Sequence, residues 1–143
     1  MNNVLNLVRA RAAVDAAFAA AAQQDKRVSV VVVDDRGHDV LAARSDGAPW
    51  FTAGVARAKA ATAAAMGAAS GDLAGLKVAH PELLELIGAQ AAHPMTTLPG
   101  GVPIRLAGTV VGAIGVSGAE PDEDAAYARA GYAAVKALGQ SMS

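Results

Sequence analysis

The sequence contains no cysteine among its 143 residues. That absence excludes disulfide bonds, catalytic thiolates, and zinc or iron–sulfur centres held by cysteine. Aromatic residues make up only 3% of the chain, which leaves little for a surface on which nucleic-acid bases could stack. The 12 basic and 13 acidic side chains give a net charge of −1, so no basic excess is present to bind a phosphate backbone. We therefore expect no nucleic-acid partner.

Long uncharged apolar runs are also missing, although 53% of the residues are apolar. A membrane-spanning helix needs about 20 such residues in a row, so we expect no membrane partner. Arg9, Arg11 and Asp15 interrupt the apolar N-terminal residues, which fit an amphipathic helix better than a secretory signal. The high apolar content predicts surface buried against another subunit. We expect a cytoplasmic homo-oligomer, a dimer or higher.

The pattern of apolar residues predicts a single domain over residues 1–143 that belongs to the α+β class. Helices are expected over residues 3–24, 52–65, 81–87 and 121–138, and strands over residues 28–33, 40–44, 104–106 and 110–116. Residues 92–98 fit either a loop or a short strand. The strands form two hairpins joined by helices, which predicts an antiparallel sheet with helices packed on it.

The glycine-rich segment 99–103 is the most informative candidate site. We expect a tight turn with an exposed backbone, because Gly100 and Gly101 have no side chains to cover their N–H groups. Those N–H groups could donate to an anionic ligand. The alternative is a tight loop that leads through Pro103 into an edge strand. The segment matches neither the phosphate-binding loop pattern nor the dinucleotide-binding fingerprint.

A second glycine-rich junction joins the last strand to the last helix. Ser117 and Gly118 precede a helix N-terminus, where backbone N–H groups attract negative charge. Four carboxylates between residues 120 and 124 can already interact with the positive end of the helix dipole. The alternative interpretation is therefore that this segment only caps the helix. Ser117 lacks the G-x-S-x-G context of a hydrolase nucleophile.

A few charged residues are candidates for binding or moving protons. Arg44 ends a predicted strand and could hold a carboxylate ligand. Lys59 lies in an alanine-rich helix, where it could either extend toward solvent or point at such a ligand. His93 and Glu82 could each move a proton, although His93 could equally pack within a loop.

Trp50 and Phe51 place two of the five aromatic residues side by side in one loop. They predict either an anchor in the core or a pocket wall or subunit contact. The three histidines have no spacing typical of a zinc site, so we expect no metal bound by protein side chains alone.

Four motifs in the expected order resemble the GlcG/HbpS family. They are Asp46-Gly-Ala48, Ala58-Lys-Ala-Ala-Thr-Ala63, Pro99-Gly-Gly-Val-Pro-Ile104 and Gly112-Ala-Ile-Gly-Val-Ser-Gly118. The resemblance implies a profilin-like α/β/α domain, with helices on both faces of a five-stranded antiparallel sheet whose fifth strand would lie near residues 95–98. It also implies assembly into dimers or larger oligomers.

The resemblance further implies haem as a ligand of some members. We expect this sequence to differ from the secreted haem sensors, because its N-terminal residues predict an amphipathic helix and not an export signal. It also lacks a histidine in the first helix, where related haem-binding domains supply an iron ligand. His93, Met95 or Thr96 could ligate iron instead.

Two functional hypotheses follow. The first is a ligand-binding protein for haem or for a small organic carboxylate, aromatic ones included, with Arg44, Trp50 and the two glycine-rich segments around the ligand. The second is a cofactor-free lyase, isomerase or deaminase that acts on a small carboxylate in a catabolic pathway. In the second, Lys59, His93 or Glu82 would move the proton. A scaffold protein without a pocket is a third alternative.

Overall fold

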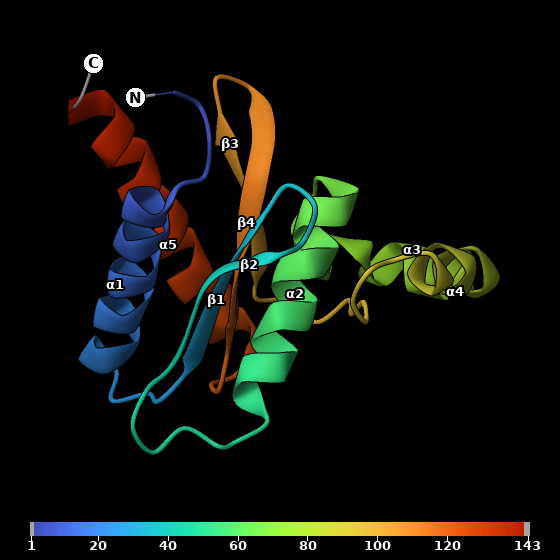
Figure 1. Cartoon of the computed structure of the whole chain (residues 1–143). Helices are drawn as coiled ribbons and strands as arrows, with labels where there is room; N and C mark the ends of the chain where they lie inside the picture. The colour runs from blue at the N-terminus through green and yellow to red at the C-terminus, as the bar shows by residue number, and fades with distance from the viewer. Residues whose placement is uncertain (1, 142–143) are drawn as a thin grey trace.

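The structure, a computed structural model, describes residues 2–141. In chain order the elements are α1 (Leu7–Gln23), β1 (Ser29–Asp34), β2 (Asp39–Arg44), α2 (Thr52–Met66), a 3₁₀ helix (Ser70–Leu73), α3 (Ala74–Ala79), α4 (Pro81–Ala89), β3 (Gly101–Leu106), β4 (Thr109–Ser117) and α5 (Pro121–Ser141). Figure 1 shows their arrangement. The α+β class and both predicted hairpins are confirmed.

The sheet has four antiparallel strands within the described residues, in the order β2-β1-β4-β3. The expected fifth strand near residues 95–98 is wrong, because the described residues 92–98 pair with no strand. Their backbone groups bond to side chains instead: Thr96 N–H donates to Thr62 Oγ1 at 3.0 Å, and the Leu98 carbonyl accepts from Ser70 Oγ at 2.6 Å. The segment is therefore anchored beside α2 rather than at a sheet edge.

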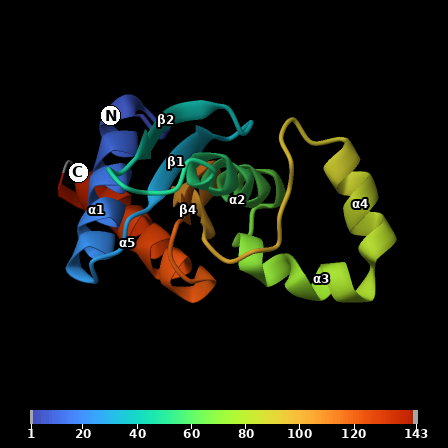
Figure 2. The ribbon, with the colours of Figure 1, turned by 90° about the horizontal axis from the view of Figure 1, so that it is seen from below.

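Helices cover both faces of the sheet, as expected. The continuous valine run of β1 is fully buried, with alternate side chains in two separate clusters. Val30 and Val32 pack in the larger cluster with α1 and α5, whereas Val31 and Val33 pack against alanines of α2. Figures 1 and 2 show the same layers, with α1 and α5 on one face and α2 on the other. A strand buried on both faces needs apolar residues at every position, which explains the uninterrupted run.

Helix α2 approaches the sheet very closely, because small residues form both sides of the contact. Ala56 and Ala60 have no exposed surface. A Cβ atom placed on Gly115 of β4 would lie only 2.0 Å from the backbone oxygen of Ala56. The excess of alanine therefore reflects a tight helix–sheet contact, in addition to the high helix propensity of that residue.

Helices α3 and α4 form an arm that projects from the rest of the protein, called the body below (Figures 1 and 2). Every residue of both helices is described, and none of those residues is buried. Helix α4 begins at Pro81, as predicted from the fixed backbone angle of proline at a first helical position. Helix α3 and the 3₁₀ helix before it were not predicted, because Gly71 and Gly75 interrupt the apolar pattern.

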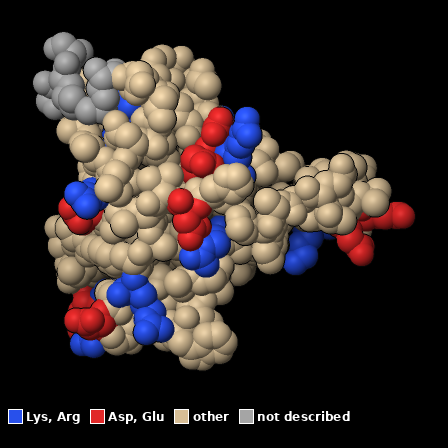
Figure 3. Space-filling model, viewed as in Figure 1, with Lys and Arg blue, Asp and Glu red and all other residues tan. Residues whose placement is uncertain are grey.

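The surface carries charges of both signs close together. In Figure 3, blue and red side chains lie beside one another on the body, and both signs recur on the arm. Arg57 of α2, for example, bonds Asp39 of β2 at 2.9 Å. None of the helices in the described part of the chain combines the length and the apolar character needed to cross a bilayer.

Candidate functional site

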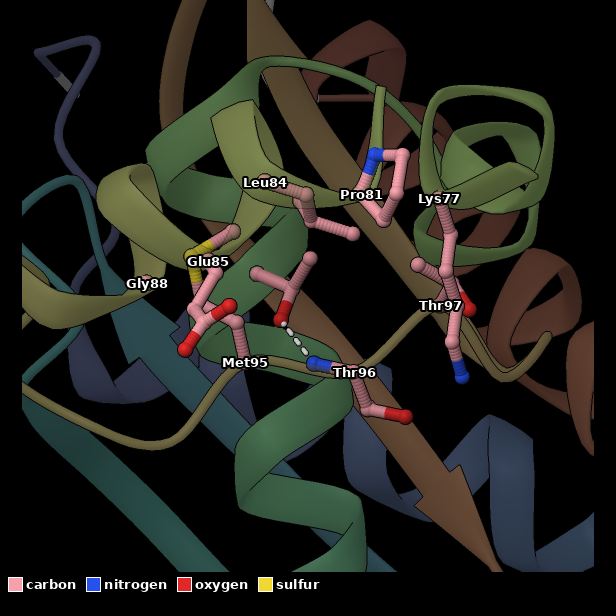
Figure 4. Close-up of a pocket in the computed structure, with 9 residues that line it drawn as sticks. Lys77, Pro81, Leu84, Glu85, Gly88, Met95, Thr96 and Thr97 are labelled. Carbon is pink, nitrogen blue, oxygen red and sulfur yellow. Dashed lines mark hydrogen bonds between the residues drawn. The ribbon is translucent and has the colours of Figure 1, made fainter. Parts of the chain in front are cut away.

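A groove with a volume of about 400 Å³ separates the arm from the body (Figure 4). It is lined by Thr62 of α2, Lys77 of α3, Pro81, Leu84, Glu85 and Gly88 of α4, and Met95, Thr96 and Thr97 of the segment that returns from the arm. The size is within the range of pockets that bind small molecules. We call it the arm groove.

The Thr62 side chain connects α2 to the segment that lines the arm groove. Its hydroxyl donates to the Ala58 carbonyl at 2.7 Å and accepts from the Thr96 N–H at 3.0 Å, the bond drawn in Figure 4. The Thr96 hydroxyl in turn accepts from the Leu98 N–H at 3.1 Å. These bonds hold the segment beside α2, and Met95 and Thr97 also line the groove.

The described lining residues give the groove a mixed chemistry. Lys77 is the only cation among them and Glu85 the only anion, and none of them is aromatic. Thr62, Thr96 and Thr97 add three hydroxyls to the lining, and Leu84 adds apolar surface. The half-buried thioether of Met95 is the single group of the lining that commonly ligates haem iron. The groove therefore offers an iron ligand, hydroxyls and one cation for an acidic group.

Two further hollows adjoin the arm groove. A hollow of about 170 Å³ is lined by Asp35, Arg36, Gly37, Ala61, Ala65, Ala91, Ala92, His93 and Met95. An open hollow of about 380 Å³, called the Trp50 hollow below, is lined by Trp50, Phe51, Gly54, Val55, Ala58, Thr96 and Leu98. Met95 is shared with the first hollow and Thr96 with the second, so all three border the segment 93–98.

Lys59, predicted as a proton carrier, is buried, with 2% of its surface exposed. Its Nζ donates to the Val116 carbonyl at 2.9 Å and to Asp124 Oδ2 at 3.0 Å. Burial raises the pKa of the Asp124 carboxyl, an effect opposed by the Lys59 charge and by hydrogen bonds from Lys59 and from the Ala119 N–H. The ammonium neither extends to solvent nor lines the arm groove; it joins α2 to β4 and α5.

Gly100 and Gly101 lie against Lys59. The prediction of an exposed turn is wrong here, because both glycines are buried and β3 already begins at Gly101. A Cβ on Gly101 would lie 2.1 Å from the Lys59 backbone oxygen, and one on Gly100 would lie 2.8 Å from Lys59 Nζ. The Gly101 N–H donates to Ser70 Oγ at 2.9 Å. The glycines admit the lysine side chain and the close helix, which is a packing reason for their presence.

The remaining predicted site residues are dispersed. Arg44 and Ser117 are both in register with Ser29, at one end of the sheet, with Gly118 directly after Ser117. Pro103 is buried opposite Ala113 in β3, which is an edge strand of the sheet as the alternative interpretation expected.

Glu82 and Trp50 lie elsewhere. Glu82 is exposed in the first turn of α4 and does not line the arm groove, whereas Glu85 does. Trp50 is 81% exposed, so a core anchor is wrong and a pocket wall or subunit contact remains. No cavity described above combines Lys59, His93 and Glu82.

Sequence reasoning missed most of the arm groove. Lys77 gave no signal, because it lies in no recognisable motif. Thr62 lies in the Ala58–Ala63 motif but was not singled out as a site residue. Met95 and Thr96 entered only as iron ligands suggested by the family resemblance. In the part of the chain that the structure describes, no three His, Asp or Glu side chains gather as a metal site.

The chain is similar in sequence and fold to proteins of a haem-related family. The family model described as "Haem degrading protein HbpS-like" matches residues 5–133. A doubly substituted variant of HbpS from Streptomyces reticuli is 36% identical, with a TM-score of 0.82 over 93% of this chain and 88% of that chain. A PduOC:heme complex is 26% identical, with a TM-score of 0.80 over 92% and 94% of the two chains. A search of curated protein sequences gives no significant match.

Proposed function

Because this chain belongs to the HbpS-like family, we propose that it is a haem-binding protein and that the arm groove holds the haem. The observation that carries the proposal is the Met95 thioether inside a groove of about 400 Å³ with Lys77 in its lining. The related PduOC domain in complex with heme supports the choice of ligand.

The residues of the arm groove fit a haem group. Met95 would ligate the iron, and His93, in the adjoining hollow on the other side of Met95, is the alternative ligand. Lys77 would bind a propionate, since an ammonium–carboxylate contact is a strong, charge-assisted hydrogen bond. Leu84 and Pro81 would cover part of the macrocycle. When bound, haem supplies an iron centre whose potential depends on its axial ligand.

A small organic carboxylate is the second candidate. Lys77 and the hydroxyls of Thr62, Thr96 and Thr97 suit a carboxylate, and no aromatic side chain among the described lining residues stacks on a large ring. A cofactor-free enzyme is the weaker proposal, because Lys59 is already bonded to Asp124 and lies apart from His93 and Glu82. The cytoplasmic location stays a prediction.

Haemin titration followed by absorption spectroscopy tests the proposal. We expect a saturable Soret band with one equivalent of haemin. Met95→Leu keeps the side-chain volume and removes the thioether, so it should shift that band and weaken binding at least tenfold. Met66→Leu is the matched control, because Met66 is also half-buried and lines none of the three hollows; its spectrum should equal that of the wild type.

Three outcomes would contradict parts of the proposal. Absorbance that rises without saturation removes haem as the ligand. An unchanged Met95→Leu spectrum together with a lost band in His93→Ala moves the iron ligand to the neighbouring hollow. Saturable binding of a small carboxylate that is lost in Lys77→Ala, without saturable haemin binding, favours the second candidate.

A further inference from the structure

The arm is anchored to the body at the two ends of the segment that forms it. At the outgoing end, Ser70 is fully buried, and its hydroxyl donates to the Leu98 carbonyl at 2.6 Å and accepts from the Gly101 N–H at 2.9 Å. At the returning end, the Thr96 N–H donates to Thr62 Oγ1 at 3.0 Å. These bonds fix the chain at residues 70 and 96, on either side of the arm.

Between these two anchors, the arm bonds only to itself. In the described chain, the hydrogen bonds of residues 74–92 join one residue of that range to another, and no ion pair includes any of them. None of the residues of α3 and α4 is buried. A segment with few buried contacts and solvent-exposed hydrogen bonds has a low free energy of local opening. The arm can therefore move while the body keeps its fold.

The backbone near both anchors leaves room for a hinge. Gly71 is packed, since a Cβ atom there would lie 2.9 Å from Pro99 Cγ, whereas nothing lies within 4 Å of the Cβ position of Gly75. Glycine also restricts the backbone less than any other residue. On the returning side, residues 91–94 belong to no helix or strand. Bending at residues 72–75 and 91–94 would move α3 and α4 relative to the body.

The chemistry of the arm groove is divided between its two walls. Lys77 and Glu85, the only charged residues of the described lining, are both on the arm, and neither forms an ion pair with another described residue. Met95 and the hydroxyl of Thr62 belong to the opposite wall. A ligand that contacts Met95 and Lys77 therefore connects the two walls. Because it gains both contacts only when the arm is near the body, its binding favours that position of the arm.

We propose that the arm is a hinged lid, which moves freely without ligand and closes over the arm groove when a ligand connects Met95 to Lys77. Closure rests on the proposed function, because it needs a ligand in the groove; the mobility of the arm does not. A closed lid shields the ligand from water and has to open again before the ligand leaves.

Distances between pairs of spin labels, measured by double electron–electron resonance, test the lid. The chain has no cysteine of its own, so two introduced cysteines take both labels. The arm pair is Glu82→Cys with Gly54→Cys, and the control pair is Val8→Cys with Gly54→Cys, which joins α1 to α2 within the body. All three sites are exposed, and none of them lines the arm groove. Without ligand, the distance distribution of the arm pair should be about twice as wide as that of the control pair.

Gallium(III) protoporphyrin is the ligand probe, because it has the shape and charge of ferric haem without unpaired electrons. Saturating porphyrin should shorten the mean distance of the arm pair and narrow its distribution to about the width of the control pair, which should not change. Lys77→Met, added to the arm pair, removes the ammonium and keeps an unbranched side chain. This variant should retain the broad distribution without ligand and lose most of the narrowing at saturating porphyrin. Circular dichroism checks that each variant is folded.

Each part of the proposal has an outcome that would overturn it. An arm pair no wider than the control pair without ligand removes the hinged arm. An arm distribution that is unchanged while the porphyrin absorption shows saturable binding removes closure, and full narrowing in Lys77→Met removes the role of the ammonium. Porphyrin that does not bind contradicts the proposed function and closure over haem, whereas a broad arm pair in that experiment still supports the mobile arm.

Discussion

Two cations on one helix illustrate how position decides the role of a residue. Arg57 and Lys59 are two residues apart in α2, about 200° around the helix, so they point in different directions. Arg57 bonds Asp39 where both side chains are at least 30% exposed. Lys59 bonds Asp124 where both are nearly inaccessible. A surface ion pair contributes little, whereas loss of one partner from a buried pair leaves an uncompensated charge.

Methionine substitutions at these two positions should therefore differ sharply. Lys59→Met should lower the free energy of unfolding by about 3–5 kcal/mol, because Asp124 stays buried without its partner. Arg57→Met should lower it by less than about 1 kcal/mol. Urea denaturation measures both values. A Lys59→Met variant as stable as Arg57→Met would show that the buried pair is not a major stabilising contact.

At the scale of elements, the contact between α2 and β4 depends on glycine and alanine. Gly115 of β4 lies against the backbone of α2, with the Ala56 oxygen 2.0 Å and the Ala60 nitrogen 2.8 Å from the place where a Cβ would be. Real side-chain carbons do not approach so closely, so any larger residue must move the helix. Backbone atoms yield less easily than the end of a flexible side chain, because the whole element moves with them.

Gly115→Ala should destabilise the protein by about 2–3 kcal/mol, because overpacking displaces α2 from the sheet. Gly75→Ala in α3 is the comparison, because nothing lies within 4 Å of its Cβ position. That change should be neutral or stabilise by up to about 1 kcal/mol, since alanine favours a helix over glycine. Thermal or urea denaturation gives both differences. Equal stability of the two variants would contradict the close approach of α2 to β4.

For the whole molecule, the Lys59–Asp124 pair connects the two helical layers past the end of the sheet. It joins residues 65 positions apart, from α2 on one face to the first turn of α5 on the other. The protonation of Asp124 is therefore expected to affect the stability of the entire fold. Because burial raises the pKa of this carboxyl above its usual value, the folded protein holds the proton to a higher pH than the unfolded chain does.

The pH dependence of stability follows from that difference. Between the ordinary aspartate pKa of about 3.9 and the raised value, the folded state binds more protons, so this group makes stability fall as pH rises. Above the raised pKa its contribution is constant. Asp124→Asn should remove that slope, which unfolding curves of both proteins across acidic to neutral pH would measure. If the free energy of unfolding of the wild type minus that of Asp124→Asn increased with pH in this window, the raised pKa would be contradicted.

The sequence alone was sufficient for most elements and for the family. The run 28–33 predicted a strand covered on both faces, and Ser29 to Val33 of β1 are all buried. The turn of the predicted hairpin of residues 104–116 is present, with Ala107 and Gly108 both at positive φ. Such features depend on residues that are close together in the sequence, so a local pattern of apolar and turn residues predicts them. The expected fifth strand failed because residues 92–98 bond to Thr62 and Ser70, two partners distant in sequence.

The candidate site was decided by the tertiary structure. Thr62, Lys77 and Met95 form one groove only because the arm leaves α2 and the chain returns along it. Lys59, which the sequence suggested as a ligand contact, has Asp124 as its partner instead, and the nearby glycines give it space. The periodicity of apolar residues and the helix and strand propensities act over a few residues, so they determine the helices and strands. The path of the chain between these elements determines which side chains share a groove, and a local sequence pattern does not predict that path.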